Sequence, residues 1–151
     1  MAQRYQGRSV PRTTLEWIEY FEKNWSTRRT IPWTLGVGAN AEELARILPS
    51  LRAWQLGETS DGSHLLAAAQ KYGAKIGDAD FEDCIRLFIA EEQYHGESLG
   101  RFLDLAGVPR AKANWGDAIF RFARHAVARM EVWATPVVMV ETHAMIYYNA
   151  I

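Results

Sequence analysis

Two side chains near the middle of the chain have types and spacing that suit a metal ion. Glu92 and His95 form a Glu-x-x-His pair, which places both on one face of a helix, at positions i and i+3. At about 100° per residue, both fall on an otherwise apolar stripe, whereas Glu91 points away from Glu92. A carboxylate on a buried face costs several kcal/mol unless a cation or another strong partner accompanies it. The pair therefore predicts a metal-binding face.

Two further carboxylates, Glu58 and Glu141, interrupt apolar stripes in the same way. Counted from the expected helix ends, Glu58, Glu92 and Glu141 each stand 14 or 15 residues into their helices. An antiparallel bundle would bring all three to one depth, roughly 21–23 Å from the turn. Glu131 is a rival to Glu141 as the third carboxylate ligand, but it lies about 80° from that stripe and nearer the helix start.

The elements that must position these side chains all show helical periodicity. No segment alternates apolar and polar residues as a strand would, so the sequence predicts an all-α fold. Thr13 and Glu16 form a capping box at the first helix, and Gly107 suits a helix end. The expected helices cover residues 14–25, residues 41–72 with an interruption or kink at Pro49, residues 79–106, and residues 127–151 with a kink near Pro136.

This pattern divides the chain into two parts. Residues 1–40 are expected to form an N-terminal helical appendage with an irregular connection, and residues 41–151 a helical bundle. The 20 residues from 107 to 126 are long enough to cross the whole bundle before the last helix begins.

The order of these ligands resembles a known family. Glu58, then Glu92 and His95 starting 34 residues later, then Glu141, resembles the ferritin-like superfamily of di-iron carboxylate proteins, which includes rubrerythrins and di-iron oxidases. The resemblance covers residues 48–151. It implies a ferritin-like bundle in which Glu58, Glu92, His95 and Glu141 hold a dinuclear iron or iron–manganese centre. It also implies an oxidoreductase that activates dioxygen or peroxide toward a small-molecule substrate.

One departure from the family concerns completeness. The family has a fourth helix with a second Glu-x-x-His, and this sequence contains no such second motif. We therefore expect the chain to be part of a longer protein, in preference to a site completed by another subunit. A homo-oligomer, most simply a dimer, is also expected.

Each of these residues also has a structural interpretation. Glu92 and His95 could form an internal ion pair, Glu58 could sit at a helix bend, and Glu141 could bind a Tyr hydroxyl. The alternative function is a non-catalytic helical module with a vestigial or structural metal site. Cys84 is expected to be an inert buried thiol.

Composition excludes several other classes of protein. The 151 residues are 48% hydrophobic and 23% charged, which is typical of one globular domain, and the net charge of −1 argues against a nucleic-acid binder. No run approaches the roughly 18 apolar residues of a membrane span. A single cysteine fits a reducing compartment, so a cytoplasmic location is expected.

Overall fold

The computed structural model describes residues 10–59, residues 61–112 and several single positions or short stretches in the last segment, which we take as residues 127–151. Those positions are residues 130, 134–135, 137–139, 141–143 and 146. Within this described part the chain is helical, with no strand, which confirms the all-α prediction. None of its helices has the length and apolar character needed to cross a membrane.

The first helix, α1, spans Thr14–Ser26 and begins as predicted. The Thr13 side chain accepts a hydrogen bond from the Glu16 backbone N–H, and the Glu16 carboxylate accepts one from the Thr13 N–H. This reciprocal pair satisfies two amide groups that the first helical turn leaves without partners. A short 3-10 helix, η1 (Trp33–Leu35), follows in the connection to the next helix.

The helix predicted over residues 41–72 is wrong in its continuity, because the structure has two helices there. These are α2 (Ala41–Glu58) and α3 (Ser63–Ile76). The chain continues in helical form through Pro49, which is exposed, so the backbone carbonyl that loses its partner at Pro49 faces the solvent side. The interruption lies instead directly after Glu58.

The break between α2 and α3 has a local cause. Gly62 adopts a left-handed conformation with φ of +70°, and the Asp61 carboxylate accepts a hydrogen bond from the Ser63 N–H at 3.0 Å. A Cβ on Gly62 would also lie 2.7 Å from side-chain atoms of Ile89 in the facing helix. A residue with a side chain would thus meet both backbone strain and a clash at this turn.

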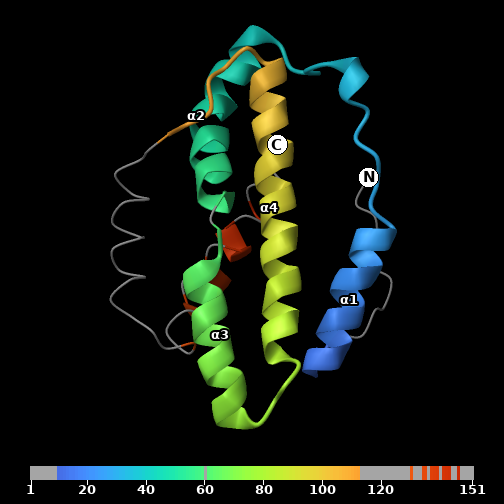
Figure 1. The fold of residues 1–151 in the computed structure, drawn as a ribbon. Coiled ribbons are helices and arrows are strands. Elements are labelled where there is room, and N and C mark those ends of the chain that lie inside the picture. Colours follow the sequence, from blue (N-terminus) through green and yellow to red (C-terminus); the bar gives the residue numbers. More distant parts are fainter. Residues whose placement is uncertain are drawn as a thin grey trace.

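The longest helix, α4 (Phe81–Leu105), is the axis of the fold. It ends in a Schellman turn around Gly107, which has a φ of +69°. The backbone N–H of Gly107 donates to the backbone carbonyl of Asp104, and that of Val108 donates to the backbone carbonyl of Leu103. The predicted stop at Gly107 is confirmed. In Figure 1, α4 lies in the centre, α2 and α3 follow one another along one side, and α1 lies along the other side.

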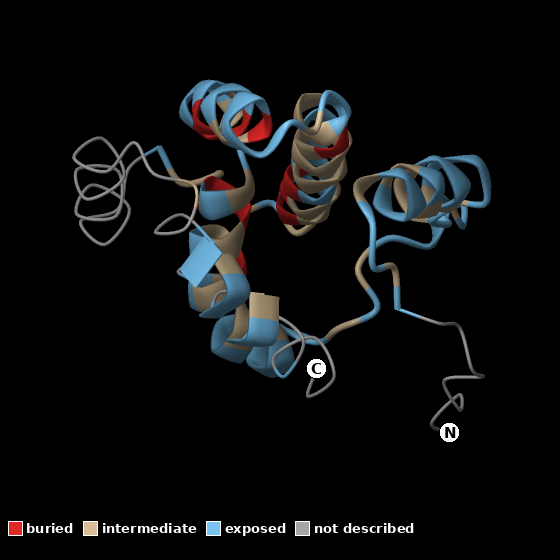
Figure 2. Cartoon of the chain, turned by 90° about the horizontal axis from the view of Figure 1, so that it is seen from below, coloured by how far each residue is buried: buried red, intermediate tan, exposed pale blue. Residues whose placement is uncertain are grey.

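The core of the described residues is small and lies where α2 and α3 pack against α4 (Figure 2). Leu65 and Ala68 of α3 are buried against Ile85, Phe88 and Ile89 of α4. Met130 and Val137 of the last segment pack against the same cluster. Met130 and Val137 therefore lie on the face that α3 and α4 form together.

Two predictions about domains and the last helix extend beyond these observations. The N-terminal helix α1 packs on α4, where the centroids of the Phe21 and Phe88 rings are 6.3 Å apart. The division of the chain into two parts at residue 40 stays a prediction. The described positions between 130 and 146 are helical, as expected for residues 127–151. Of the predicted crossing span from 107 to 126, residues 113–126 lie outside the described residues, as does the predicted kink at Pro136.

Candidate metal centre

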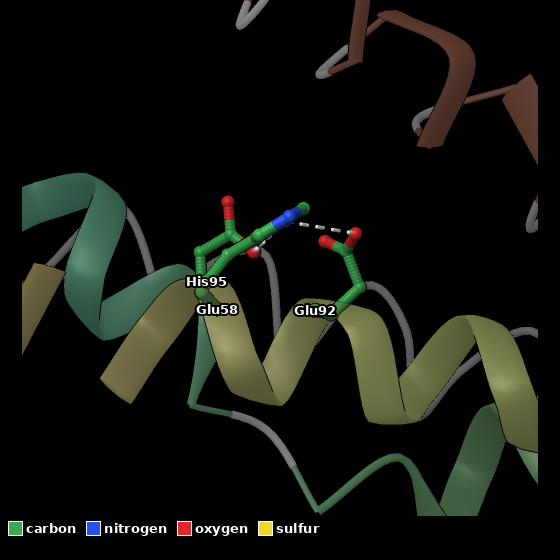
Figure 3. A group of neighbouring side chains, drawn as sticks. All are labelled: Glu58, Glu92 and His95. Carbon is green, nitrogen blue, oxygen red and sulfur yellow. Dashed lines mark ion pairs between the residues drawn. The ribbon is translucent and has the colours of Figure 1, made fainter. Parts of the chain in front are cut away.

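Glu58, Glu92 and His95 converge in one group of side chains (Figure 3). Glu58 is the last residue of α2, and the other two lie one turn apart on α4. His95 Nδ1 lies 4.0 Å from Glu58 Oε2 and 3.8 Å from Glu92 Oε1. One ligand atom from each residue lies within 4.8 Å of the others. The structure thus brings three of the four predicted ligands together.

A glycine allows α2 and α4 to approach closely at this point. Gly96 is buried, and a Cβ added there would lie 3.0 Å from the Glu58 carbonyl oxygen and 3.1 Å from Glu58 Cβ. Because Gly96 has no side chain, the end of α2 rests directly on the α4 backbone. This contact holds the Glu58 carboxylate above Glu92 and His95.

The three side chains differ strongly in burial. The Glu58 side chain is 10% exposed, that of Glu92 24% and that of His95 48%. Glu58 Oε2 is fully buried, and no group in the described part of the chain donates a hydrogen bond to it. A buried carboxylate oxygen without a donor is costly, and a bound cation would remove that cost.

The pKa of Glu92 also shows that these carboxylates lack a compensating positive charge. Burial, followed by the neighbouring Glu58 carboxylate, raises the pKa of Glu92 to about 9, with smaller contributions from Glu141 and Glu91. The Glu58 and Glu92 carboxylates, whose ligand atoms lie within 4.8 Å of each other, repel when both are ionised. Without a metal, Glu92 therefore retains its proton at neutral pH. A cation between them would reverse that preference.

Glu141 lies beside this group without being part of it. Val137, one turn earlier, packs on the core of α3 and α4, and Glu141 is half-buried. Burial and then the charge of Glu58 raise the pKa of Glu141, while His95 acts in the opposite direction. These influences place Glu141 near the group, although its carboxylate is not among the atoms within 4.8 Å of one another. Its predicted rival, Glu131, lies outside the described residues.

The donor set fits a transition metal. Two ligands of one ion can be separated by at most about 4.2 Å, twice a metal–ligand bond of about 2.1 Å. The two distances from His95 Nδ1 satisfy this limit. Two carboxylates and one imidazole suit Fe(II), Mn(II) or Zn(II). The site also lies at the C-terminal end of α2, where the helix dipole favours a cation.

Among the described residues, His64, His143 and Cys84 take no part in this group. His64 and His143 are exposed, and His143 Nδ1 lies 2.7 Å from the Met139 carbonyl oxygen of its own helix. Cys84 is buried as predicted, and burial followed by the charge of Asp78 raises the pKa of its thiol. A raised pKa keeps the thiol protonated and unreactive.

Sequence reasoning missed two positions near the site. Gly96 is one, and its signal is a glycine one residue after a predicted ligand within a helical pattern. Gln55 is the other. It lies one turn before Glu58, is 4% exposed, and its Oε1 accepts no hydrogen bond from any described residue. A polar side chain three residues from Glu58 on the same helix face was the available signal.

No model of a protein family, no curated protein and no solved structure matches this chain. The likeness to ferritin-like proteins rests on the residue pattern alone.

Proposed function

We propose that Glu58, Glu92 and His95 bind one metal ion and that Glu141 helps to hold a second. The centre would be the dinuclear iron or iron–manganese site of a ferritin-like oxidoreductase. The observation that supports this most strongly is the convergence of the three side chains around the buried Glu58 Oε2, which accepts no hydrogen bond from the described residues. A cation is the partner that such a group lacks.

The chemistry of the ligands supports iron or manganese. Oxygen-rich ligation with a single imidazole suits Fe(II) and Mn(II). When bound, such a pair of ions supplies redox chemistry toward dioxygen or peroxide. Glu92 lies one turn from His95 and within 4.8 Å of Glu58, so it would hold an ion together with both residues.

The chain's own residues would bind the ions and limit access to them. Glu58 and Glu92 would neutralise the metal charge, and Glu92 would release its proton when a cation binds. His95, which is the most exposed of the three, would face the side from which small molecules arrive. Phe88 lies one turn before Glu92 and restricts water on the core side.

The experiment adds Fe(II) to the metal-free protein under argon and then admits oxygen. We expect a near-UV absorption band that requires oxygen, and Glu58→Gln should remove it. Glu91→Gln is the matched control, because it changes a neighbouring carboxylate outside the group. Iron retention without an oxygen-dependent band would favour the alternative, a non-catalytic module with a structural metal. No iron retention would contradict both functions.

A further inference from the structure

The guanidinium of Arg28 lies between two aromatic rings. Its central carbon is 3.7 Å from the centroid of the Trp25 ring and 3.6 Å from that of Tyr94. The two ring centroids are 6.5 Å apart and the ring planes are inclined by 62°, so the guanidinium lies in a wedge between the rings. Both rings contact the planar group, and the N–H donors on its edge that point out of the wedge remain for a ligand.

Arg28, like Arg101, has no carboxylate partner among the described residues, whereas three other arginines do. Arg46 pairs with Glu42, Arg86 with Glu82, and Arg110 with both Glu97 and Asp104. Within the described residues, Arg28 forms no ion pair and donates no hydrogen bond, and its contacts are the two rings. Its charge is thus held in place without being neutralised.

The aromatic clamp adjoins the candidate metal centre. Tyr94 directly precedes His95 on α4, and the two ring centroids are 6.4 Å apart. His95 is also the most exposed of the three converging side chains. Arg28 lies just after α1, which runs along the side of α4 opposite α2 (Figure 1), so Tyr94 and its neighbour His95 are the link between Arg28 and the metal centre.

A second arginine extends the positive charge along the same face. Arg101 lies seven residues after Tyr94, which places it two turns further on the same side of α4. Its guanidinium carbon lies 4.8 Å from the centroid of the Trp33 ring, in the connection that follows α1. The seam between this connection and α4 thus carries two arginines stacked on aromatic rings.

We propose that Arg28 binds the carboxylate group of a small-molecule ligand. A guanidinium edge presents paired donors that match the two oxygens of a carboxylate, and the two rings that contact it fix its orientation. The proposal of a carboxylate site at Arg28 rests on the contacts of Arg28 and does not depend on the proposed metal centre. That the bound carboxylate belongs to the substrate, with its other end toward His95, rests on the proposed function.

The test follows the arginine Nε–H signals of the full-length, metal-free protein by NMR during titration with sodium acetate. Sodium chloride replaces acetate at constant ionic strength in the reference titration. The Arg28 signal is assigned by its loss in Arg28→Lys, and that of Arg46 by its loss in Arg46→Lys. Arg46 is the matched control, because it is exposed and already paired with Glu42.

We expect the Arg28 signal to move saturably with acetate and to stay still with chloride, while Arg46 is unaffected. Tyr94→Leu should weaken acetate binding about tenfold, because it removes one of the two rings that contact the guanidinium. Equal shifts at Arg28 and Arg46, no shift at either, or saturation by inorganic phosphate without acetate binding would overturn the proposal.

Metal binding is measured separately on Arg28→Lys, which should retain Mn(II) affinity within about twofold because Arg28 is no ligand. If the unchanged protein binds Mn(II) but no acetate, this inference alone is removed. Acetate binding without metal binding removes the proposed function alone.

Discussion

At the scale of single residues, Glu58 and Glu92 are two neighbouring carboxylates that are both shielded from solvent. Each carboxylate is largely buried, they face the same ring, and the carboxylate of Glu58 raises the pKa of Glu92. His95 lies within ion-pair distance of both carboxylates, at 4.0 Å from Glu58 and 3.8 Å from Glu92, although neither separation is a hydrogen bond. A metal ion would satisfy all three groups at once.

Replacing His95 tests the nitrogen ligand. His95→Ala should weaken Mn(II) binding by more than the roughly 10–100-fold that loss of an indirect partner costs, since it removes a direct ligand. Isothermal titration calorimetry on metal-free protein measures this. His143→Ala is the control, because His143 contacts only its own helix and should bind Mn(II) as the unchanged protein does. Equal affinities for the two variants would rule out His95 as a ligand.

The pH dependence of stability tests Glu92. Its pKa is about 9 in the folded, metal-free protein, against 4.5 as the reference. Between these values the folded state binds more protons than the unfolded state, so the free energy of unfolding falls as pH rises. Urea denaturation in the presence of a chelator should give a lower midpoint at about pH 8.5 than at about pH 5.5.

Glu92→Gln should make that slope shallower, because the amide has no proton to lose. Glu141, whose pKa is also raised, contributes in the same direction to the slope that remains. A midpoint that rises over this range, or a slope that Glu92→Gln leaves unchanged, would contradict the burial described for Glu92.

At the scale of elements, the junction of α2 with α4 positions Glu58. Gly96→Ala would place a methyl group 3.0–3.1 Å from Glu58 backbone and Cβ atoms, so the end of α2 must move by a few tenths of an ångström. We expect a loss of roughly 1–3 kcal/mol in stability and weaker metal binding. Thermal unfolding and Mn(II) titration measure both effects.

Gly57→Ala is the matched control for this contact. A Cβ at Gly57 meets nothing within 4 Å, and the residue lies inside α2. Alanine should therefore stabilise α2 by roughly 0.5–1 kcal/mol and leave metal affinity unchanged. If both glycine variants lost metal affinity equally, close approach at Gly96 would not explain the site.

Sequence predicted the elements that depend on local signals. The Thr13 and Glu16 capping box and the Gly107 stop act within a few residues, and both are confirmed. The break after Glu58 was missed in favour of Pro49. A proline whose lost hydrogen bond faces solvent leaves the helix continuous, whereas Gly62 interrupts it through its backbone conformation and its contact with Ile89.

The candidate site was predictable where its residues interrupt apolar stripes. Glu58, Glu92 and His95 do so, and the structure brings them together. The support from Gly96 and the clamp on Arg28 were not predictable in this way, because both depend on which helices meet. A glycine within a helix or an arginine after one gives no periodic signal.

At the scale of the whole molecule, the last segment carries exposed apolar side chains. Val138, Met139 and Ile146 are 63%, 58% and 67% exposed, although Val137, directly before them, packs on the core. Scattered exposure is ordinary, but three such side chains on one helical segment suit the predicted homo-oligomer.

Sedimentation equilibrium tests that expectation. The protein should form dimers, and Val138→Glu should weaken dimerisation about tenfold by placing a charge in the contact. Ile76→Glu is the control, because Ile76 is also exposed but lies at the end of α3. A protein that stays monomeric at all concentrations, or an equal effect of both variants, would contradict a contact through residues 137–146.

The most direct measurement of the central claim is anomalous X-ray diffraction from crystals grown with Mn(II). We predict an anomalous peak within about 2.3 Å of Glu58 Oε2, a Glu92 oxygen and His95 Nδ1. A second peak about 3.5–4 Å away, toward Glu141, is expected for a dinuclear centre. Manganese bound only at exposed carboxylates such as Glu42 and Glu43, with none between Glu58, Glu92 and His95, would contradict the account.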